Sequence, residues 1–422
     1  MEKFIVLGGR ALKGEIETRG SKNAATPLLA ACLLTEETCE IDNLPLIEDV
    51  FRIIEILQSL GAETEWMGER KLRVRAKDID PEKIDQEKIC QLRSSILILG
   101  ALVARFGNFK FAHPGGCLIG SRPLETHFEA LKELGVSIEE KENFYFVRKD
   151  WLKVEKNKKI VLREFSVTAT ENVLLATSLF PGKISLRIAA AEPHVQELCF
   201  FLEKMGVKIK DIGSHSLEIE GKEKLDGAKH TVIPDPTESG TLAIAAAATR
   251  GKVKIKNFRA DHAELVLEKL KEMGVNFSLG EDFLEINPSV RFRPAKIQTL
   301  PYPGIPTDLQ APLAVLCTQG EGASLIHDAM YENRFKYLNE LEKMGAAVKI
   351  LNPHEALISG PTPLYGKQIK SFDLRAGATL IIAALMAQGR SEISDIYQVD
   401  RGYEKIEERL SALGADIKRV KE

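Results

Sequence analysis

A phrase that recurs six times constrains the fold of this chain more than any other feature. Each copy reads as the end of an amphipathic helix, a glycine and an alternating strand, and the copies recur at intervals of about 70 residues. A glycine at a helix C-terminus can adopt the positive φ that lets the chain leave the helix. The six glycines are Gly61, Gly135, Gly206, Gly274, Gly345 and Gly414.

A second, more apolar helix lies upstream of each phrase. We expect these helices at residues 23–34, 94–104, 170–180, 237–249, 308–316 and 375–387. A segment rich in β-branched residues, such as CEIDNL or VKIKNF, separates the two helices and predicts a strand. Six units of helix, strand, helix, strand, strand are too few and too long for a solenoid. The sequence therefore predicts an α/β fold of βαβ-type repeats, three per domain, with the apolar helices buried and the sheets outside.

The first turn of each apolar helix is polar. Equivalent helix starts point the same way in a symmetric domain, so three of them would converge on one face. Two such faces opposed would form a cleft lined by positive helix ends, which suits a polyanionic small molecule. Lys22, Arg93 and Arg375 occupy these first turns, where a cation is unfavourable unless an anion lies nearby. Each of them alone could be a solvated side chain, but their equivalent places favour an anion site.

Net charge, apolar runs and cysteine content limit the binding partners and the cellular compartment that we expect for this chain. The formal charge of −3 argues against binding to nucleic acid or an anionic membrane. No apolar run approaches the roughly 18 residues of a membrane span, and the N-terminal stretch shows neither a sustained apolar core nor a cleavage-like site. Six cysteines without a CxxC pair indicate buried free thiols in a reducing compartment. We expect a soluble cytoplasmic protein, and nothing in the sequence implies an obligate protein partner.

Common cofactor and metal motifs are missing from the sequence. There is no P-loop, no GxGxxG after a strand and no HExxH, and the eight histidines lack metal-ligand spacing. We therefore expect no metal and no cofactor.

Three features carry candidate chemistry. Cys117 lies in the glycine-rich segment HPGGCLIGSRP, which reads either as a mobile loop that brings a thiol to a ligand or as a turn with an inert cysteine. Arg122, Arg334 and Arg401 follow strands, where arginine suits bidentate capture of carboxylate or phosphate but could also be solvated. Asp308 could cap the helix that it starts or act as a carboxylate base.

Six motifs together resemble one family. They are SKNAA at 21–25, HPGGCLIGSRP at 113–123, PTDLQA at 306–311, ENRF at 332–335, DLRA at 373–376 and DRGYEKIE at 400–407. Their order and spacing across the whole chain resemble the UDP-N-acetylglucosamine 1-carboxyvinyltransferases. The related 5-enolpyruvylshikimate-3-phosphate synthases share the sixfold architecture and a lysine near the start. They typically lack the GGC loop, and after that lysine they carry an SNR-type signature where this chain has Asn23-Ala24-Ala25.

The resemblance implies a two-domain inside-out α/β barrel. One domain would span 22–230, and the other would combine 1–21 with 231–422, with the active site in the cleft between them. The implied reaction moves the enolpyruvyl group of phosphoenolpyruvate to the 3-hydroxyl of UDP-N-acetylglucosamine and releases phosphate.

The family also implies roles for individual residues. Cys117 resembles the thiol that protonates C3 of phosphoenolpyruvate or forms an adduct at C2, and Asp308 resembles the base for the sugar hydroxyl. Lys22, Arg122 and Arg401 resemble the residues that hold phosphoenolpyruvate. Further implied substrate contacts are Asn23, Arg93, Pro123, Leu124, His127, Ser166, Val167, Thr307, Met330, Arg334 and Arg375.

The chain departs from the family in two places. Residues 163–165 read Arg-Glu-Phe where some members carry a lysine near the diphosphate, and His194 lies where other members can have an acidic residue. The alternatives are transfer to another acceptor, such as shikimate 3-phosphate, and a non-catalytic UDP-sugar-binding paralogue. The presence of Lys22, Cys117, Asp308 and Arg401 argues against the paralogue, because a binding module needs no acid–base pair.

Overall fold

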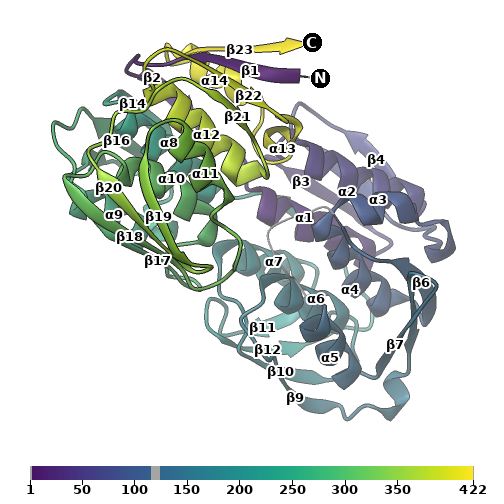
Figure 1. Cartoon of the computed structure of the whole chain (residues 1–422). Coiled ribbons are helices and arrows are strands. Elements are labelled where there is room, and N and C mark those ends of the chain that lie inside the picture. Colours follow the sequence, from purple (N-terminus) through teal and green to yellow (C-terminus); the bar gives the residue numbers. More distant parts are fainter. Residues whose placement is uncertain (1, 116–123, 422) are drawn as a thin grey trace. The chain divides into compact units, whose positions relative to one another are not determined.

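The computed structural model describes residues 2–115 and 124–421, which form two compact units (Figure 1). The first unit combines residues 2–19 with 234–421, and the second combines 20–115 with 124–233. A separate hydrophobic core fills each unit.

The apolar helices lie at the centre of each unit, as the sequence predicts. The second unit contains α1 (Lys22–Ala31), α4 (Ile96–Arg105) and α6 (Val167–Thr177), and α4 packs against both of the others. The first unit contains α8 (Pro236–Ala248), α10 (Thr307–Cys317) and α12 (Leu374–Met386), which pack against one another. Helix α6 begins earlier than expected because the Ser166 hydroxyl caps it by accepting from the Ala169 N–H.

The amphipathic helices also follow the prediction. They are α2 (Glu48–Ser59), α5 (Glu125–Glu133), α7 (Pro193–Lys204), α9 (Glu264–Glu272), α11 (Lys336–Lys343) and α14 (Ile406–Ala412). Each is followed by its repeat glycine, and the φ angles of these six glycines range from 72° to 106°. The positive φ confirms why glycine recurs at this point. Two short helices, α3 (Gln86–Gln91) and α13 (Tyr397–Asp400), interrupt the pattern.

Three sheets cover the helices of the second unit. The strand order of one sheet is β13 (Lys229–Thr231), β3 (Thr38–Asp42), β5 (Leu72–Arg75) and β4 (Glu63–Trp66). The order of the second sheet is β6 (Asn108–Ala112), β8 (Phe144–Lys149) and β7 (Val136–Lys141). The order of the third sheet is β11 (Lys208–Lys210), β12 (Ser216–Glu220), β10 (Lys183–Arg187) and β9 (Asn157–Val161).

Three more sheets belong to the first unit. The strand order of one sheet is β15 (Asn276–Leu279), β16 (Phe283–Asn287), β14 (Lys252–Lys256) and β2 (Lys13–Glu17). The order of the next sheet is β17 (Lys296–Thr299), β18 (Gly322–Asp328), β20 (Glu355–Gly360) and β19 (Ala347–Asn352). The order of the last sheet is β21 (Gln368–Lys370), β22 (Arg390–Ser394), β1 (Glu2–Leu7) and β23 (Asp416–Lys421).

Two features of these sheets were not expected from the repeat. Five sheets gain a short strand that runs parallel to the strand after the apolar helix: β2, β9, β13, β17 and β21. In the last sheet, β1 lies antiparallel between β22 and β23, so the N-terminal strand completes the C-terminal repeat (Figure 1).

Four of the five described cysteines are buried. Cys32, Cys39, Cys199 and Cys317 are buried free thiols, whereas Cys90 is exposed, against the expectation of burial. Within the described ranges, every helix is too short or too polar to cross a bilayer.

Candidate active site

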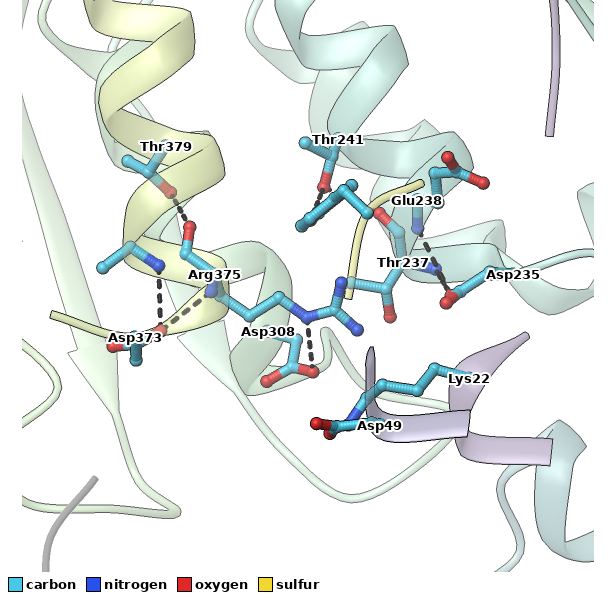
Figure 2. Close-up of polar contacts among 12 residues, drawn as sticks. Lys22, Asp49, Asp235, Thr237, Glu238, Thr241, Asp308, Asp373, Arg375 and Thr379 are labelled. Carbon is cyan, nitrogen blue, oxygen red and sulfur yellow. Dashed lines mark hydrogen bonds and ion pairs between the residues drawn. The ribbon is translucent and has the colours of Figure 1, made fainter. Parts of the chain in front are cut away.

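A partly buried cluster of two arginines and one aspartate lies at the helix starts of the first unit. Asp373 caps α12 by accepting from the backbone N–H groups of Arg375 and Ala376, at 2.8 and 2.9 Å. This cap fixes Arg375 in the first turn, where its side chain is only 2% exposed. The Nε of Arg375 donates to Oδ2 of Asp308 at 2.9 Å (Figure 2), and Nη2 of Arg334 donates to Oδ1 at 2.9 Å. The structure therefore brings three predicted site residues together.

The interpretation of Asp308 as a helix cap is wrong. Helix α10 begins after Pro306, and no side chain caps it. The Asp308 carboxylate instead accepts the two guanidinium hydrogen bonds, which are charge-assisted and stronger than a bond to a neutral backbone N–H.

The cluster carries more positive than negative charge. Two guanidinium groups share the Asp308 carboxylate, and Nη1 and Nη2 of Arg375 are buried without a hydrogen-bond partner among the described residues. Burial opposes the charged form of Arg375, but attraction to Tyr403, Asp308 and Asp235 outweighs it and raises the pKa of the guanidinium. Buried donors without partners are costly, so this arrangement suits an anionic ligand.

Thr307 and Met330 are tied to a buried aspartate that the sequence analysis missed. Asp328 is fully buried and accepts from the Thr307 hydroxyl at 2.6 Å and from the Met330 N–H at 3.0 Å. It also accepts from Thr299 at 2.9 Å. Asp328 thus fixes the start of α10 to the end of β18, and no motif or local spacing indicated it.

Lys22 begins α1 in the second unit. Its Nζ forms an ion pair with Oδ2 of Asp49 at 3.2 Å, and Asp49 is buried in the first turn of α2. Asn23 follows in the same turn of α1, which Ser21 caps. Asp49 holds the ammonium group in place, and the sequence analysis did not name it.

His127 is fixed by neighbours on two sides. It is 2% exposed, and its Nδ1 lies 2.9 Å from Nδ2 of Asn172 while its Nε2 lies 3.2 Å from the Thr168 hydroxyl. Asn172 Oδ1 accepts from the Gly100 N–H at 2.8 Å, which orients its amide nitrogen toward His127. The ring thus ties α5 to α6.

The other predicted contacts of this unit lie near helix starts. Arg93 opens the 3₁₀ helix Arg93–Ser95 before α4, and Leu124 precedes α5. Ser166 caps α6, and Val167 is its first residue.

The unusual segment at 163–165 makes contacts of its own. Arg163 forms an ion pair with Glu129 at 2.6 Å, and Glu164 accepts from the Thr126 hydroxyl at 3.0 Å. The Phe165 ring meets His215 edge-on, with centroids 4.7 Å apart. Arg163 therefore already has a carboxylate partner.

Four predicted residues remain to be placed. Arg401 follows the short helix α13 rather than a strand, and its Nη1 donates to Gln398 at 3.2 Å. Cys117, Arg122 and Pro123 lie outside the described residues. Within residues 2–115 and 124–421, no group of three or more His, Cys, Asp or Glu side chains could hold a metal ion.

Comparison with known proteins gives matches over nearly the whole chain. Residues 6–410 match the family model of EPSP synthase (3-phosphoshikimate 1-carboxyvinyltransferase). The UDP-N-acetylglucosamine 1-carboxyvinyltransferase of Koribacter versatilis is 40% identical over 100% of this chain and 97% of its own length. UDP-N-acetylglucosamine 1-carboxyvinyltransferase 1 of Caldanaerobacter subterraneus subsp. tengcongensis is 41% identical over 99% of each chain.

Solved structures show the same fold. The enolpyruvyl transferase NikO from Streptomyces tendae superimposes with a TM-score of 0.89 at 25% identity, covering 99% of both chains. EPSP synthase from Acinetobacter baumannii gives a TM-score of 0.74 at 18% identity over 100% of both chains. These matches confirm the predicted two-domain α/β fold.

Proposed function

This chain belongs to the EPSP synthase family, and on that premise we propose that it transfers the enolpyruvyl group of phosphoenolpyruvate to the 3-hydroxyl of UDP-N-acetylglucosamine. The acceptor follows from full-length relatives at 40–41% identity that carry the name UDP-N-acetylglucosamine 1-carboxyvinyltransferase. The compared EPSP synthase is only 18% identical, which disfavours shikimate 3-phosphate as the acceptor.

The observation that carries the proposal is the arginine pair around Asp308. Phosphoenolpyruvate presents a planar carboxylate, which matches the fork of donors on a guanidinium group. The two buried Nη atoms of Arg375 supply such a fork, and Arg334 lies on the other side of Asp308. Binding of the carboxylate would satisfy the donors of Arg375 that lack a partner in the described structure.

Asp308 and Cys117 supply the base and the acid. In the addition step, Cys117 gives a proton to C3 of phosphoenolpyruvate, while the sugar oxygen bonds to C2 and passes its proton to Asp308. In the elimination step, C3 returns a proton to the Cys117 thiolate and the C2–C3 double bond re-forms. The bond between C2 and the phosphate oxygen breaks, and the departing phosphate takes up the proton held by Asp308. Fixed cations near the reacting carbon stabilise the charges that develop during both steps.

The phosphate of phosphoenolpyruvate is assigned to Lys22, Arg122 and Arg401. The UDP-sugar is assigned to the remaining predicted contacts, namely Asn23, Arg93, Pro123, Leu124, His127, Ser166, Val167, Thr307 and Met330. Because these residues come from both units, we propose that segments 22–230 and 1–21 with 231–422 act as two domains on one substrate pair.

The proposed reaction sets a cellular role. It contributes to peptidoglycan synthesis in the cytoplasm, and hence to cell shape and division. It requires no cofactor, nucleic acid, membrane or protein partner. The Cys117 thiol makes the enzyme a target for fosfomycin, an epoxide that resembles phosphoenolpyruvate.

The direct test is phosphate release. The purified chain is mixed with phosphoenolpyruvate and either UDP-N-acetylglucosamine or shikimate 3-phosphate. We expect release only with the UDP-sugar; a folded protein that releases none would refute the proposal.

In a second test, fosfomycin should add one mass equivalent to the peptide that contains Cys117, and Cys117→Asp should remain unlabelled. Labelling at another cysteine would refute the assignment of Cys117 as the active-site thiol.

A further inference from the structure

The neighbours of Tyr403 determine to which group its hydroxyl donates a hydrogen bond. Tyr403 is 1% exposed, and its oxygen lies 3.1 Å from Oγ1 of Thr241. Thr241 already donates its single hydroxyl proton to the Thr237 carbonyl at 2.7 Å, within α8. Thr241 must therefore accept from Tyr403, since each hydroxyl has one proton to give. The lone pairs of the Tyr403 oxygen remain available to attract the Arg375 guanidinium, and this attraction is among the causes that raise the pKa of Arg375.

The Tyr403 ring lies against the guanidinium group of Arg375. The central carbon of that group is 5.2 Å from the ring centroid, within the range of a cation–π interaction. Figure 2 shows the Arg375 side chain reaching from α12 toward the first turn of α8, where Thr237 lies. Asp308 holds the Nε edge of the same group, so carboxylate and ring contact it from different sides.

We propose that Tyr403, held by Thr241, is a positioning residue that fixes the plane of the Arg375 guanidinium so that Nη1 and Nη2 face the carboxylate of phosphoenolpyruvate. The inference rests on the proposed function and extends it to two residues outside the predicted site. A guanidinium held only at Nε can rotate its outer nitrogens away from a ligand. The ring and its directed hydroxyl remove that freedom before the substrate binds, which lowers the entropic cost of binding.

Tyr403→Phe tests the hydroxyl while keeping the ring. Because the hydroxyl acts through Arg375 on one substrate, we expect KM for phosphoenolpyruvate to rise about fivefold to tenfold. The kcat and the KM for UDP-N-acetylglucosamine should stay within about twofold, since a binding contact kept through the transition state leaves kcat unchanged.

Thr241 gives an independent arm of the experiment. Thr241→Val removes the acceptor and should raise the same KM, whereas Thr241→Ser should restore it. The double variant with Tyr403→Phe should be no worse than the worse single variant, because both changes break one hydrogen bond.

Tyr337→Phe is the matched control. Tyr337 is also 1% exposed in the first unit, and its hydroxyl donates to Gln310 at 2.6 Å. Its loss should leave both KM values unchanged.

Three outcomes would overturn the inference: an unchanged KM for phosphoenolpyruvate in both Tyr403→Phe and Thr241→Val, an equal rise in both KM values, or the same rise in the Tyr337 control. If Tyr403→Phe does not fold, Thr241→Val carries the same test. A wild-type protein that releases no phosphate would instead refute the proposed function.

Discussion

Glu171 makes the stability of the second unit depend on pH. It lies in α6 with a side chain that is 2% exposed, and its Oε1 has no hydrogen-bond partner among the described residues. Burial, followed by repulsion from Glu192, raises its pKa well above the ordinary value of 4.5. The folded protein therefore keeps Glu171 protonated at pH values where the unfolded chain ionises it.

The sign and size of the effect follow from proton linkage. Above pH 4.5, folding takes up one proton at this site, so the free energy of unfolding falls by about 1.4 kcal/mol per pH unit until the folded pKa is reached. Over any two pH units between 4.5 and the folded pKa, the loss is about 2.7 kcal/mol. Glu171→Gln keeps the shape and removes the ionisation, so this fall should disappear. For a domain of this size, a free-energy difference of about 2.7 kcal/mol corresponds to roughly 5–10 °C in Tm.

Tryptophan fluorescence isolates the unit concerned. Both tryptophans, Trp66 and Trp151, belong to the second unit, so their emission reports its unfolding in the full chain. Wild type, Glu171→Gln and the exposed-site control Glu223→Gln should be unfolded by heat and by urea at pH 5.5, 6.5 and 7.5. The control should follow wild type. Parallel pH profiles for wild type and Glu171→Gln would refute the reasoning.

Three further predictions concern packing, a buried lysine and catalysis. Gly100→Ala would place a Cβ 2.4 Å from Oδ1 of Asn172, so urea unfolding should show a loss of about 2 kcal/mol or more; a loss below about 0.5 kcal/mol would contradict the contact. Burial lowers the pKa of Lys149, whose Nζ donates to the Ala104 carbonyl, from 10.5 to about 8. The folded state therefore binds fewer protons than the unfolded chain between about pH 8 and 10.5, and wild-type stability should rise across that window. Lys149→Met should remove the rise, measured as Tm at pH 8 and 10. Asp308→Asn should lower kcat about 100-fold or more in the phosphate-release assay while urea unfolding still shows a folded protein; a kcat within about threefold of wild type would exclude Asp308 as the base.

The repeat and its central helices could be predicted because the information that forms them is local. Apolar periodicity identified the buried helices, and the glycine after each amphipathic helix marked a positive φ that the structure confirms. The boundary of α6 was missed because a serine cap outweighed the apolar pattern. The short parallel strands were missed because three to five residues carry too little pattern to read.

The motifs named most of the site, but they could not say what each side chain contacts. From its sequence neighbours, Asp308 resembled a helix cap, yet its partner Arg375 is 67 residues away. Tyr403 and Thr241 are 162 residues apart, and the hydrogen bond between them has no local signature. Asp49, which pairs with Lys22, is likewise set by the packing of α1 against α2.

The sequence by itself therefore determined the repeat, the buried helices and the identities of the chemical groups. These depend on backbone preferences and side-chain periodicity within a few turns of chain. Only the tertiary structure decided which charges share a partner, which donors stay unsatisfied and which carboxyl stays protonated. Those properties depend on distance and burial, and both are set when segments far apart in sequence exclude water from between them.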